Sequence, residues 1–313
     1  MKPILIRDKY RVDRKIAEGG AGLVYAGTDV TCDKDVAIKL MENRNGPTAL
    51  RQEAVVYQQL EEAPGFPDFY WSGSDGSYEF LVFELLGPSL ADLFAYCEYK
   101  FSLKTILLIA DQAIARIERI HRHFLHRDIK PENFLLGTGK QGNTIYAVDF
   151  GLATKVYSEE EYRGYEGLAF EGTYRYASIN CHRGLEPSWR DDLESLGYVL
   201  LYFARGSLPW EESKVTTMNK NSIFKDMKAS LSGAELCEGF LPQEFALMID
   251  CARSLKIGEK PDYRYFRRLF RDRFLAEGFH YDNVFDWTER RFHEIRGELN
   301  QKEFAWGAID SFQ

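Results

Sequence analysis

Hydrophobic positions follow two kinds of spacing along the chain. The first, typical of strands, occupies about the first 85 residues. Short apolar runs rich in β-branched and aromatic residues predict strands over Tyr10–Ala17, Val24–Asp29, Asp35–Met41 and Tyr78–Phe83. Another stretch, Thr48–Glu62, spaces its apolar residues three and four positions apart, which predicts a helix with one buried face. This part of the chain therefore favours a group of strands with a single helix.

The second kind of spacing is helical and covers most of the remaining chain. Periodic apolar residues predict helices over Ser102–His123, Asp192–Phe203, Gln243–Leu255 and Tyr263–Phe274. The last of these mixes arginines with aromatics, and we favour buried aromatics with solvated arginines over nucleic-acid binding. We therefore expect an α+β protein in which a strand-rich lobe meets a helix-rich lobe near Leu86–Ser89.

The final segment, Thr288–Gln313, has the pattern of a charged helix. Its apolar residues Phe292, Ile295, Leu299 and Phe304 fall on one face. We expect this face to pack against the helical lobe, and docking of a partner protein is the alternative.

Composition narrows the class of protein. The 313 residues allow two modest domains or one two-lobed unit, and 45% hydrophobic with 28% charged residues excludes a disordered or collagen-like chain. Because 40 Lys and Arg face 48 Asp and Glu, the net charge is −8, so nonspecific nucleic-acid binding is not the default. Five scattered cysteines without a Cys-x-x-Cys pair favour free thiols over a zinc or redox motif.

Apolar segments are too short for a signal peptide or a membrane span. The most apolar run, Leu196–Ala204, has about half of the roughly 20 residues that a membrane helix needs. We therefore expect an intracellular protein of the cytoplasm or nucleus that contacts neither membrane nor nucleic acid.

A glycine cluster, Glu18–Gly22, is the first candidate for chemistry. On its own it fits a plain hairpin turn as well as a phosphate-binding loop. A dinucleotide-binding loop would lead into a helix, whereas Leu23–Tyr25 continues as a strand, and no Walker Gly-Lys-Ser/Thr follows. A glycine-rich hairpin whose N–H groups approach a phosphate is the better interpretation.

Lys39 is the second candidate. A lysine in a strand is usually a solvated edge charge. This one directly follows Val36–Ile38, and an unpaired ammonium among apolar residues is costly. We expect it to meet an anion, either a phosphate beneath the glycine hairpin or the carboxylate of Glu53 on the next helix.

A third group of polar residues follows the long helix. The loop His126–Asn133 is strongly polar, and an apolar run directly after it argues against a simple charged surface loop. Further on, Asp149 stands at the end of the apolar strand Tyr146–Val148 and before a phenylalanine and a glycine. Together Asp128, Asn133 and Asp149 offer a base and oxygen ligands for Mg²⁺.

These motifs occur together in the order of the protein-kinase signature set, which the chain resembles. Over about Tyr10 to Trp287 it resembles eukaryotic Ser/Thr protein kinases, and among them the casein kinase I family. The narrower resemblance is carried by five segments: Leu85–Leu90, Arg175–Asn180, Asp191–Tyr198, Gly206–Trp210 and Lys260–Tyr263. Within the second segment, Ser178, Ile179 and Asn180 stand where most kinases have Ala-Pro-Glu.

The resemblance implies a fold and an activity. The fold is the two-lobed protein kinase fold, with a small antiparallel sheet in residues 1–86, a mainly helical lobe in 87–287 and a helical extension in 288–313. The activity is transfer of the γ-phosphate of ATP, with Mg²⁺, to Ser or Thr hydroxyls of acidic or primed protein substrates. We also expect a monomer.

The resemblance assigns roles to the polar residues. Asp128 would orient the substrate hydroxyl and accept its proton. Lys130 would contact the γ-phosphate and marks Ser/Thr specificity. Asn133 and Asp149 would hold Mg²⁺. All polar catalytic positions of the family are filled, which argues against a kinase-like scaffold without activity.

The same resemblance assigns the nucleotide contacts. Lys39, held by Glu53, would contact the α and β phosphates. Phe83 would narrow the pocket behind adenine, and Ala17 replaces the first glycine of the family loop. The residues expected around the nucleotide are Ile16, Ala17, Glu18, Gly19, Gly20, Gly22, Val24, Ala37, Phe83, Glu84, Leu86, Leu135 and Val148.

Substrate selection departs from the family pattern. The family binds an upstream phosphate in a basic pocket, of which Arg175 is present and Lys220 is a possible substitute. However, the segment 168–171 lacks the family lysine, Glu211 and Glu212 follow Trp210, and Asn221 replaces another lysine. We therefore expect a weakened preference for phosphorylated substrates.

The activation segment is acidic. Residues 155–171 carry two basic and five acidic side chains, a net charge of −3. A solvated acidic loop is the simpler interpretation. The alternative is that one of its glutamates pairs with Arg127 and replaces an activating phosphate.

Overall fold

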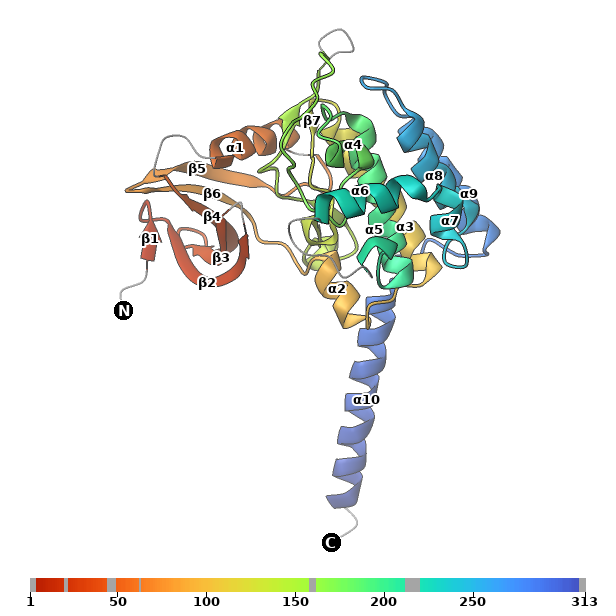
Figure 1. Cartoon of the computed structure of the whole chain (residues 1–313). Helices are drawn as coiled ribbons and strands as arrows, with labels where there is room; N and C mark the ends of the chain where they lie inside the picture. Colours follow the sequence, from red (N-terminus) through yellow and green to blue (C-terminus); the bar gives the residue numbers. More distant parts are fainter. Residues whose placement is uncertain are drawn as a thin grey trace.

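Figure 1 shows a small sheet-containing lobe beside a larger helical lobe. The computed structural model describes residues 4–19, 22–43, 49–61, 63–157, 162–211 and 220–309, and in the last helix it describes no side chains at 297 or 299–309. The small lobe consists of β1 (Ile4–Ile6), β2 (Tyr10–Gly19), β3 (Gly22–Asp29), β4 (Lys34–Glu42), α1 (Ala49–Leu60), β5 (Phe69–Asp75) and β6 (Tyr78–Glu84).

The small lobe is built on one antiparallel sheet with strand order β1-β2-β3-β4-β6-β5. Successive side chains of a strand point to opposite faces. On β4, Val36 and Ile38 pack in a small core on one face, while Ala37 joins the main core on the other. The alternation therefore sends Lys39 to the same face as Ala37, where α1 packs.

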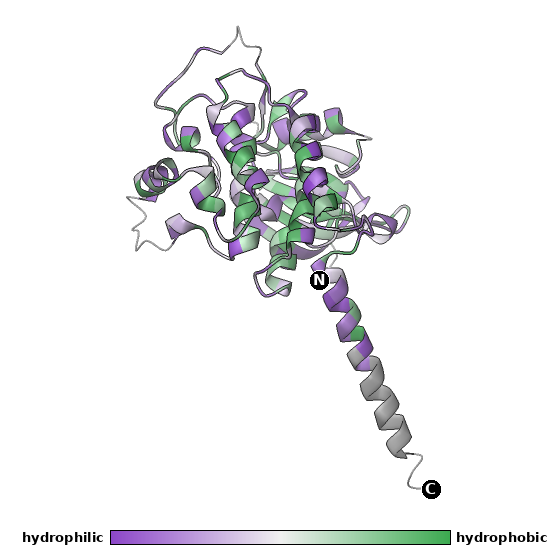
Figure 2. Cartoon of the chain, turned by 90° about the vertical axis from the view of Figure 1, so that its right-hand side faces the viewer, coloured by the Kyte–Doolittle hydropathy of each residue, from purple (hydrophilic) through white to green (hydrophobic). Residues whose placement is uncertain are grey.

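The helical lobe surrounds two central helices. Its helices are α2 (Leu90–Tyr96), α3 (Leu103–Ile120), α4 (Ile179–His182), α5 (Trp189–Arg205), α6 (Lys220–Ser230), α7 (Gly233–Cys237), α8 (Gln243–Ser254), α9 (Tyr263–Ala276) and α10 (Asp286–Ile309). Helix α3 packs on α5 and α9, and α5 also packs on α8. Figure 2 shows hydrophobic residues concentrated inside the body of the molecule.

Four short strands carry the polar loops between α3 and α4. They are β7 (Phe124–Leu125), β8 (Phe134–Leu136), β9 (Ile145–Ala147) and β10 (Thr154–Lys155). Strand β8 pairs with β9, and β7 pairs with β10. These pairings bring the loop after β7 beside the segment after β9, so two of the polar motifs lie next to each other.

The start of α10 belongs to the core of the helical lobe. Trp287 is 6% exposed, stacks on Phe285 with ring centroids 4.4 Å apart and meets Phe101 edge-on at 5.4 Å. Both carboxylate oxygens of Asp286 accept hydrogen bonds from Ser102, one from its N–H and one from its hydroxyl, each at 2.6 Å. The base of α10 is therefore fixed to the start of α3.

Beyond its base, α10 leaves the body of the protein (Figure 1). Phe292 is 61% exposed and Ile295 is 41% exposed, so the expectation that this face packs on the helical lobe is wrong for both residues. The helix is held at its base and by polar contacts such as that of Glu294 with the Tyr96 hydroxyl at 2.7 Å, and its axis then points outward. Leu299 and Phe304 lie outside the described side chains.

The predicted elements are present with small shifts at their ends, and further ones appear. The sequence pattern did not predict the strands β1, β5, β7, β8 and β10 or the helices α4, α6 and α7. No helix among the described residues has the length and apolarity needed to cross a membrane.

Candidate active site

A buried lysine shared by two carboxylates joins the two lobes. The Nζ atom of Lys39 on β4 lies 2.7 Å from Oε2 of Glu53 on α1 and 2.7 Å from Oδ1 of Asp149, which follows β9. The Lys39 and Glu53 side chains are 5% and 1% exposed, and that of Asp149 is 30% exposed. The pairing of Lys39 with Glu53 that we expected from the sequence is therefore present, and Asp149 adds a second carboxylate.

Burial and charge act against each other in this triad. Burial alone would lower the pKa of Lys39, but the Glu53 and Asp149 carboxylates outweigh it and raise that pKa. Burial would raise the pKa of Asp149, yet the Lys39 ammonium lowers it below the usual carboxyl value. Lys39 therefore stays an ammonium and Asp149 a carboxylate over the physiological range.

Aromatic packing holds Asp149 in place. Its backbone lies in the left-handed region, with φ 65°, and its N–H donates to the Tyr57 hydroxyl at 3.2 Å. The next residue, Phe150, is fully buried and contacts Tyr57 at a centroid distance of 5.0 Å and His126 at 5.3 Å. A residue in this sparsely populated backbone region persists only where its surroundings fix it.

The polar loop after β7 is anchored by Asp192 in α5. This carboxylate is 2% exposed and accepts hydrogen bonds from the N–H of His126 at 2.7 Å, the N–H of Arg127 at 2.8 Å and the Nε2 of His121 at 2.8 Å. It holds Arg127 at a φ of 70°. We had not assigned Asp192 a role from the sequence, since a carboxylate within a buried helix gives no local sign of its distant donors.

Asp128 is surrounded by three polar groups. Its Oδ1 accepts from the Thr173 hydroxyl at 2.7 Å, its Oδ2 accepts from Lys130 Nζ at 2.5 Å, and its backbone oxygen accepts from Asn133 Nδ2 at 2.8 Å. The contact with Thr173 ties the catalytic loop to the segment that precedes α4. No sequence pattern indicates this bond, because the two residues are 45 positions apart.

Asn133 and Asp149 have the donor atoms that a hard cation needs. The Asn133 amide nitrogen points to the backbone of Asp128, which turns its carbonyl oxygen the other way, and Asp149 uses only Oδ1 toward Lys39 among the described contacts. One amide oxygen and one carboxylate oxygen are therefore free of these bonds. Such oxygens fit Mg²⁺, which takes few protein ligands and completes its shell with water and phosphate.

The glycine cluster forms a hairpin between two strands. Gly19 at the end of β2 pairs with Gly22 at the start of β3, while Gly20 and Ala21 lie outside the described residues. Gly22 has a φ of 113°, and a Cβ there would lie 2.5 Å from the Leu40 carbonyl oxygen. A strand follows the cluster, as expected for a phosphate-covering hairpin and unlike a dinucleotide-binding loop.

The other predicted nucleotide contacts come from several elements. Ala37 and Phe83 are buried, and Phe83 stacks on Tyr57 with centroids 5.5 Å apart. Ala17 and Glu18 lie on β2, and Ile16 beside them is 40% exposed. The remaining members, all partly buried, are Val24, Glu84, Leu86, Leu135 and Val148. Their contact with a nucleotide stays a prediction.

Arg127 is paired with the acidic activation segment. Its Nη2 contacts the Glu171 carboxylate, and its Nη1 donates to the Leu152 carbonyl at 3.3 Å. Gly172 has a φ of 102° and a Cβ there would lie 2.8 Å from the Arg127 carbonyl oxygen, so the segment presses closely on the loop. The pairing of a glutamate with Arg127, our less favoured interpretation of the sequence, is therefore present.

The two cations expected to bind substrate phosphate have other partners. Arg175 forms an ion pair with Glu211, and Lys220 lies over the Tyr174 ring at 5.8 Å. Asn221 accepts from Nδ1 of His182 at 2.6 Å through its Oδ1. The described contacts do not join Arg175 and Lys220 in one cluster.

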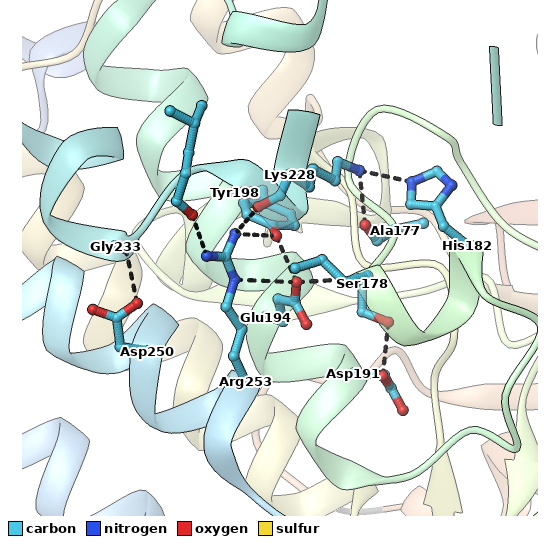
Figure 3. Close-up of polar contacts among 12 residues, drawn as sticks. Ala177, Ser178, His182, Asp191, Glu194, Tyr198, Lys228, Gly233, Asp250 and Arg253 are labelled. Atoms are coloured by element: carbon cyan, nitrogen blue, oxygen red, sulfur yellow. Dashed lines mark hydrogen bonds and ion pairs between the residues drawn. The ribbon is translucent and has the colours of Figure 1, made fainter. Parts of the chain in front are cut away.

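A second buried lysine supports the segment that follows Thr173. Lys228 on α6 is 0% exposed and donates to the carbonyl of Tyr174 at 2.8 Å. It also donates to the carbonyl of Ala177 at 2.7 Å and to Nε2 of His182 at 3.0 Å, and Figure 3 shows these two contacts. Its Nζ also lies 4.8 Å from the centre of the Trp210 ring. We had no expectation for Lys228, which the sequence presents as an ordinary helix lysine.

The ion pair between Arg253 and Glu194 supports the start of α4. Glu194 on α5 accepts from the Ile179 N–H at 3.1 Å and from the Tyr198 hydroxyl at 2.5 Å. Arg253 on α8 lies 3.5 Å from Glu194 and donates to Tyr198 at 2.8 Å. Figure 3 shows Tyr198 and Arg253 converging on the Glu194 carboxylate. The start of α4 is therefore fixed by buried polar groups from three helices.

His182 gives this support a pH dependence. Burial, and then the Lys228 ammonium, lower the pKa of His182 to about 4, against 6.5 in an unfolded chain. Between these values the unfolded chain takes up a proton that the folded protein refuses, so this residue's contribution to stability is lost as the pH falls from about 6.5 to 4. The loss is on the order of 3 kcal/mol.

We expect the variant His182→Gln to lack this dependence. In urea unfolding at pH 7 and pH 4.5, the free-energy difference between wild type and His182→Gln should shrink by roughly 2–3 kcal/mol at the lower pH. His280→Gln, at an exposed position, is the control and should follow the wild type at both pH values. If the difference in the free energy of unfolding between wild type and His182→Gln is the same at both pH values, the assignment is wrong.

Comparison with known proteins agrees with this geometry. Residues 10–244 match the protein kinase domain family. The match covers more than half of the chain and includes the lysine triad, the loop around Asp128, and the segment held by Lys228. The two lobes, with an antiparallel sheet in one and helices in the other, are those of that family's fold. The chain therefore belongs to the protein kinase family.

Proposed function

We propose that this protein kinase transfers the γ-phosphate of ATP to Ser or Thr hydroxyls of acidic protein substrates, and that it is of the casein kinase I type. The observation that carries the proposal is the contact of Lys39 with both Glu53 and Asp149. It brings a buried ammonium and a carboxylate of lowered pKa to the same side of the sheet as Ala37, one of the expected nucleotide contacts. On the helical lobe, the hydrogen bond from the Asn133 amide to the Asp128 backbone oxygen fixes the positions of these two residues relative to each other.

The chain's residues divide the work of phosphoryl transfer. Lys39 neutralises charge on the α and β phosphates, and Asn133 and Asp149 would hold Mg²⁺, which supplies further neutralisation when bound. Asp128 accepts the hydroxyl proton on one of its two carboxylate oxygens, of which Oδ1 now accepts from Thr173 and Oδ2 from Lys130. Lys130, beside Oδ2, stabilises the negative charge of the transferred group. The transition state is loose, so positioning and charge do most of the work.

Selection of Ser and Thr rests on the surroundings of Asp128. Lys130 and Thr173 occupy its two carboxylate oxygens. The base therefore lies close to the backbone at Gly172 and Thr173, where a short hydroxyl would reach it more readily than the hydroxyl at the end of a tyrosine ring. The casein kinase I type rests on the sequence resemblance and on Ser178, which caps α4 and donates to Asp191 at 2.7 Å.

The variant Asp128→Asn tests the chemistry. We expect phosphate transfer to casein to fall by roughly 10²–10⁴, because the amide cannot accept the hydroxyl proton. Binding of ATP with Mg²⁺, followed by thermal shift, should persist, since Lys39, Asn133 and Asp149 are unchanged. Radiolabelled transfer measures the first quantity. Transfer at the wild-type rate would reject the proposal.

The environment of Arg175 favours substrates without a priming phosphate. Glu211 already forms an ion pair with Arg175. An incoming phosphate would have to break this pair, and Lys220 interacts with the Tyr174 ring instead of adding a second cation. A single guanidinium already bound to a carboxylate is a poor phosphate site.

Matched peptides with Ser or phosphoserine three residues upstream of the target test this preference. We expect wild-type kcat/KM to differ between them by less than about threefold, and Glu211→Gln, which frees Arg175, to increase the ratio in favour of the phosphorylated peptide about tenfold. A large preference for the phosphorylated peptide in the wild type would refute the idea. An unchanged ratio in the variant would show that Glu211 is not the cause.

Glu171 provides a built-in replacement for an activating phosphate. Its carboxylate meets Arg127, whose backbone N–H is held by Asp192 and whose neighbour is Asp128. The ion pair therefore fixes the activation segment directly against the catalytic loop. In kinases that need activation, a phosphate brings such an arginine and the activation segment together.

The variant Glu171→Gln tests this replacement. We expect kcat to fall about tenfold, because the neutral amide leaves Arg127 without its charged partner. Glu166→Gln, at an exposed glutamate of the same segment, is the matched control and should keep wild-type activity. The enzyme is first shown by mass spectrometry to be unphosphorylated. Equal activity of the two variants, or an inactive unphosphorylated wild type, would count against the replacement.

A further inference from the structure

A polar pocket lies away from the candidate active site, against α3. Its volume is about 510 Å³. Its walls come from α3, the turn at Pro64 and Gly65, the turn between β8 and β9, and the segment between α9 and α10. None of the residues that line it takes part in the catalytic arrangement described above.

Arg116 on α3 presents a largely unpaired guanidinium to this pocket. Its Nε donates to the Ile145 carbonyl at 2.8 Å. Gly65 lies directly against it, since a Cβ at that position would be 1.8 Å from the Arg116 Nε. Within the described part of the chain, the two terminal nitrogens of Arg116 have no hydrogen-bond partner, although the side chain is half-buried. Arginine presents five donors in a fixed fork, and here one is used.

Positive charge accumulates around this guanidinium. Arg267 and Arg271 on α9 both bind Asp111, with Nε–Oδ1 distances of 2.9 and 3.0 Å. Together with Arg116 they make three positive charges against one negative, 3 − 1 = +2, in a protein whose net charge is −8. Burial, and then the charge of Arg267, lower the pKa of Arg116. An anion in the pocket would relieve this imbalance.

We propose that the pocket is a docking site for an acidic segment of another protein, whose carboxylate pairs with Arg116. An inorganic anion alone is too small an occupant, since a water molecule takes about 30 Å³ of liquid volume and the pocket holds about 510 Å³. Amide side chains of Gln112, Asn143 and Asn283 line the same pocket. Gln112 is already bonded to the backbone of Asn143 and Ile145. The side chains of Asn143 and Asn283 are therefore the ones that offer donors and acceptors to a peptide backbone.

Such a site has a consequence for substrate use that rests on the proposed kinase function. A substrate that binds at this pocket is tethered to the kinase, which raises the effective concentration of its other segments at the active site. Docking then lowers KM for proteins that carry an acidic segment and leaves kcat unchanged. Binding of the acidic segment does not depend on phosphate transfer. An experiment can therefore reject the docking site without rejecting the proposed kinase function, and the reverse.

Fluorescence anisotropy with a fluorescein-labelled hexaglutamate peptide, blocked at both ends, tests the site on the full chain. We expect Arg116→Gln to weaken binding about tenfold, because a charge-assisted pair is lost. Arg119→Gln removes a charge from the same helix outside the pocket and should change binding less than twofold. Equal weakening by the two substitutions, or no binding to the wild type, would overturn the proposal.

Two further measurements exclude simpler explanations. Arg116→Lys keeps the charge but loses the fork, and it should also weaken binding; it serves in place of Arg116→Gln if that variant does not fold. Inorganic phosphate is compared with chloride at equal ionic strength as a competitor. If phosphate displaces the peptide at concentrations at which chloride does not, the pocket is a small-anion site and the peptide assignment is wrong.

Discussion

The arrangement of both lobes depends on one buried ammonium. Lys39 cannot remain charged in a dry environment without anions, and the chain supplies two, Glu53 and Asp149, from elements far apart in sequence. Each carboxylate fixes the element that carries it: Glu53 draws α1 against the sheet, and Asp149 draws the segment after β9 under it. The same contacts hold an ammonium on the face of the sheet where we propose that the phosphates of ATP bind.

Sequence patterns predicted this part of the protein well, for physical reasons. The alternation of β4 places Lys39 between buried neighbours, so its need for an anion is visible in the sequence. The helical spacing of α1 then presents Glu53 on the buried face, together with Leu50 and Tyr57. Local rules of this kind predicted most of the longer strands and helices and the pairing of Lys39 with Glu53.

Long-range partners were beyond those rules. Asp192 and Lys228 are each surrounded by groups that lie far away in sequence, and no spacing marks them as buried. The direction of α10 was also missed, because an apolar face shows that a helix is amphipathic but not where its axis points. Strand β5 escaped notice because glycine and serine interrupt its apolar run.

The enclosure of Lys228 also determines how this amine can react. Three aromatic rings and two carbonyl groups surround its Nζ, and none of the side chain is accessible to water. Acylating reagents therefore reach the nitrogen only while the shell around it is transiently open. Its rate of acylation therefore reports how often the packing beneath Tyr174 and Ala177 opens.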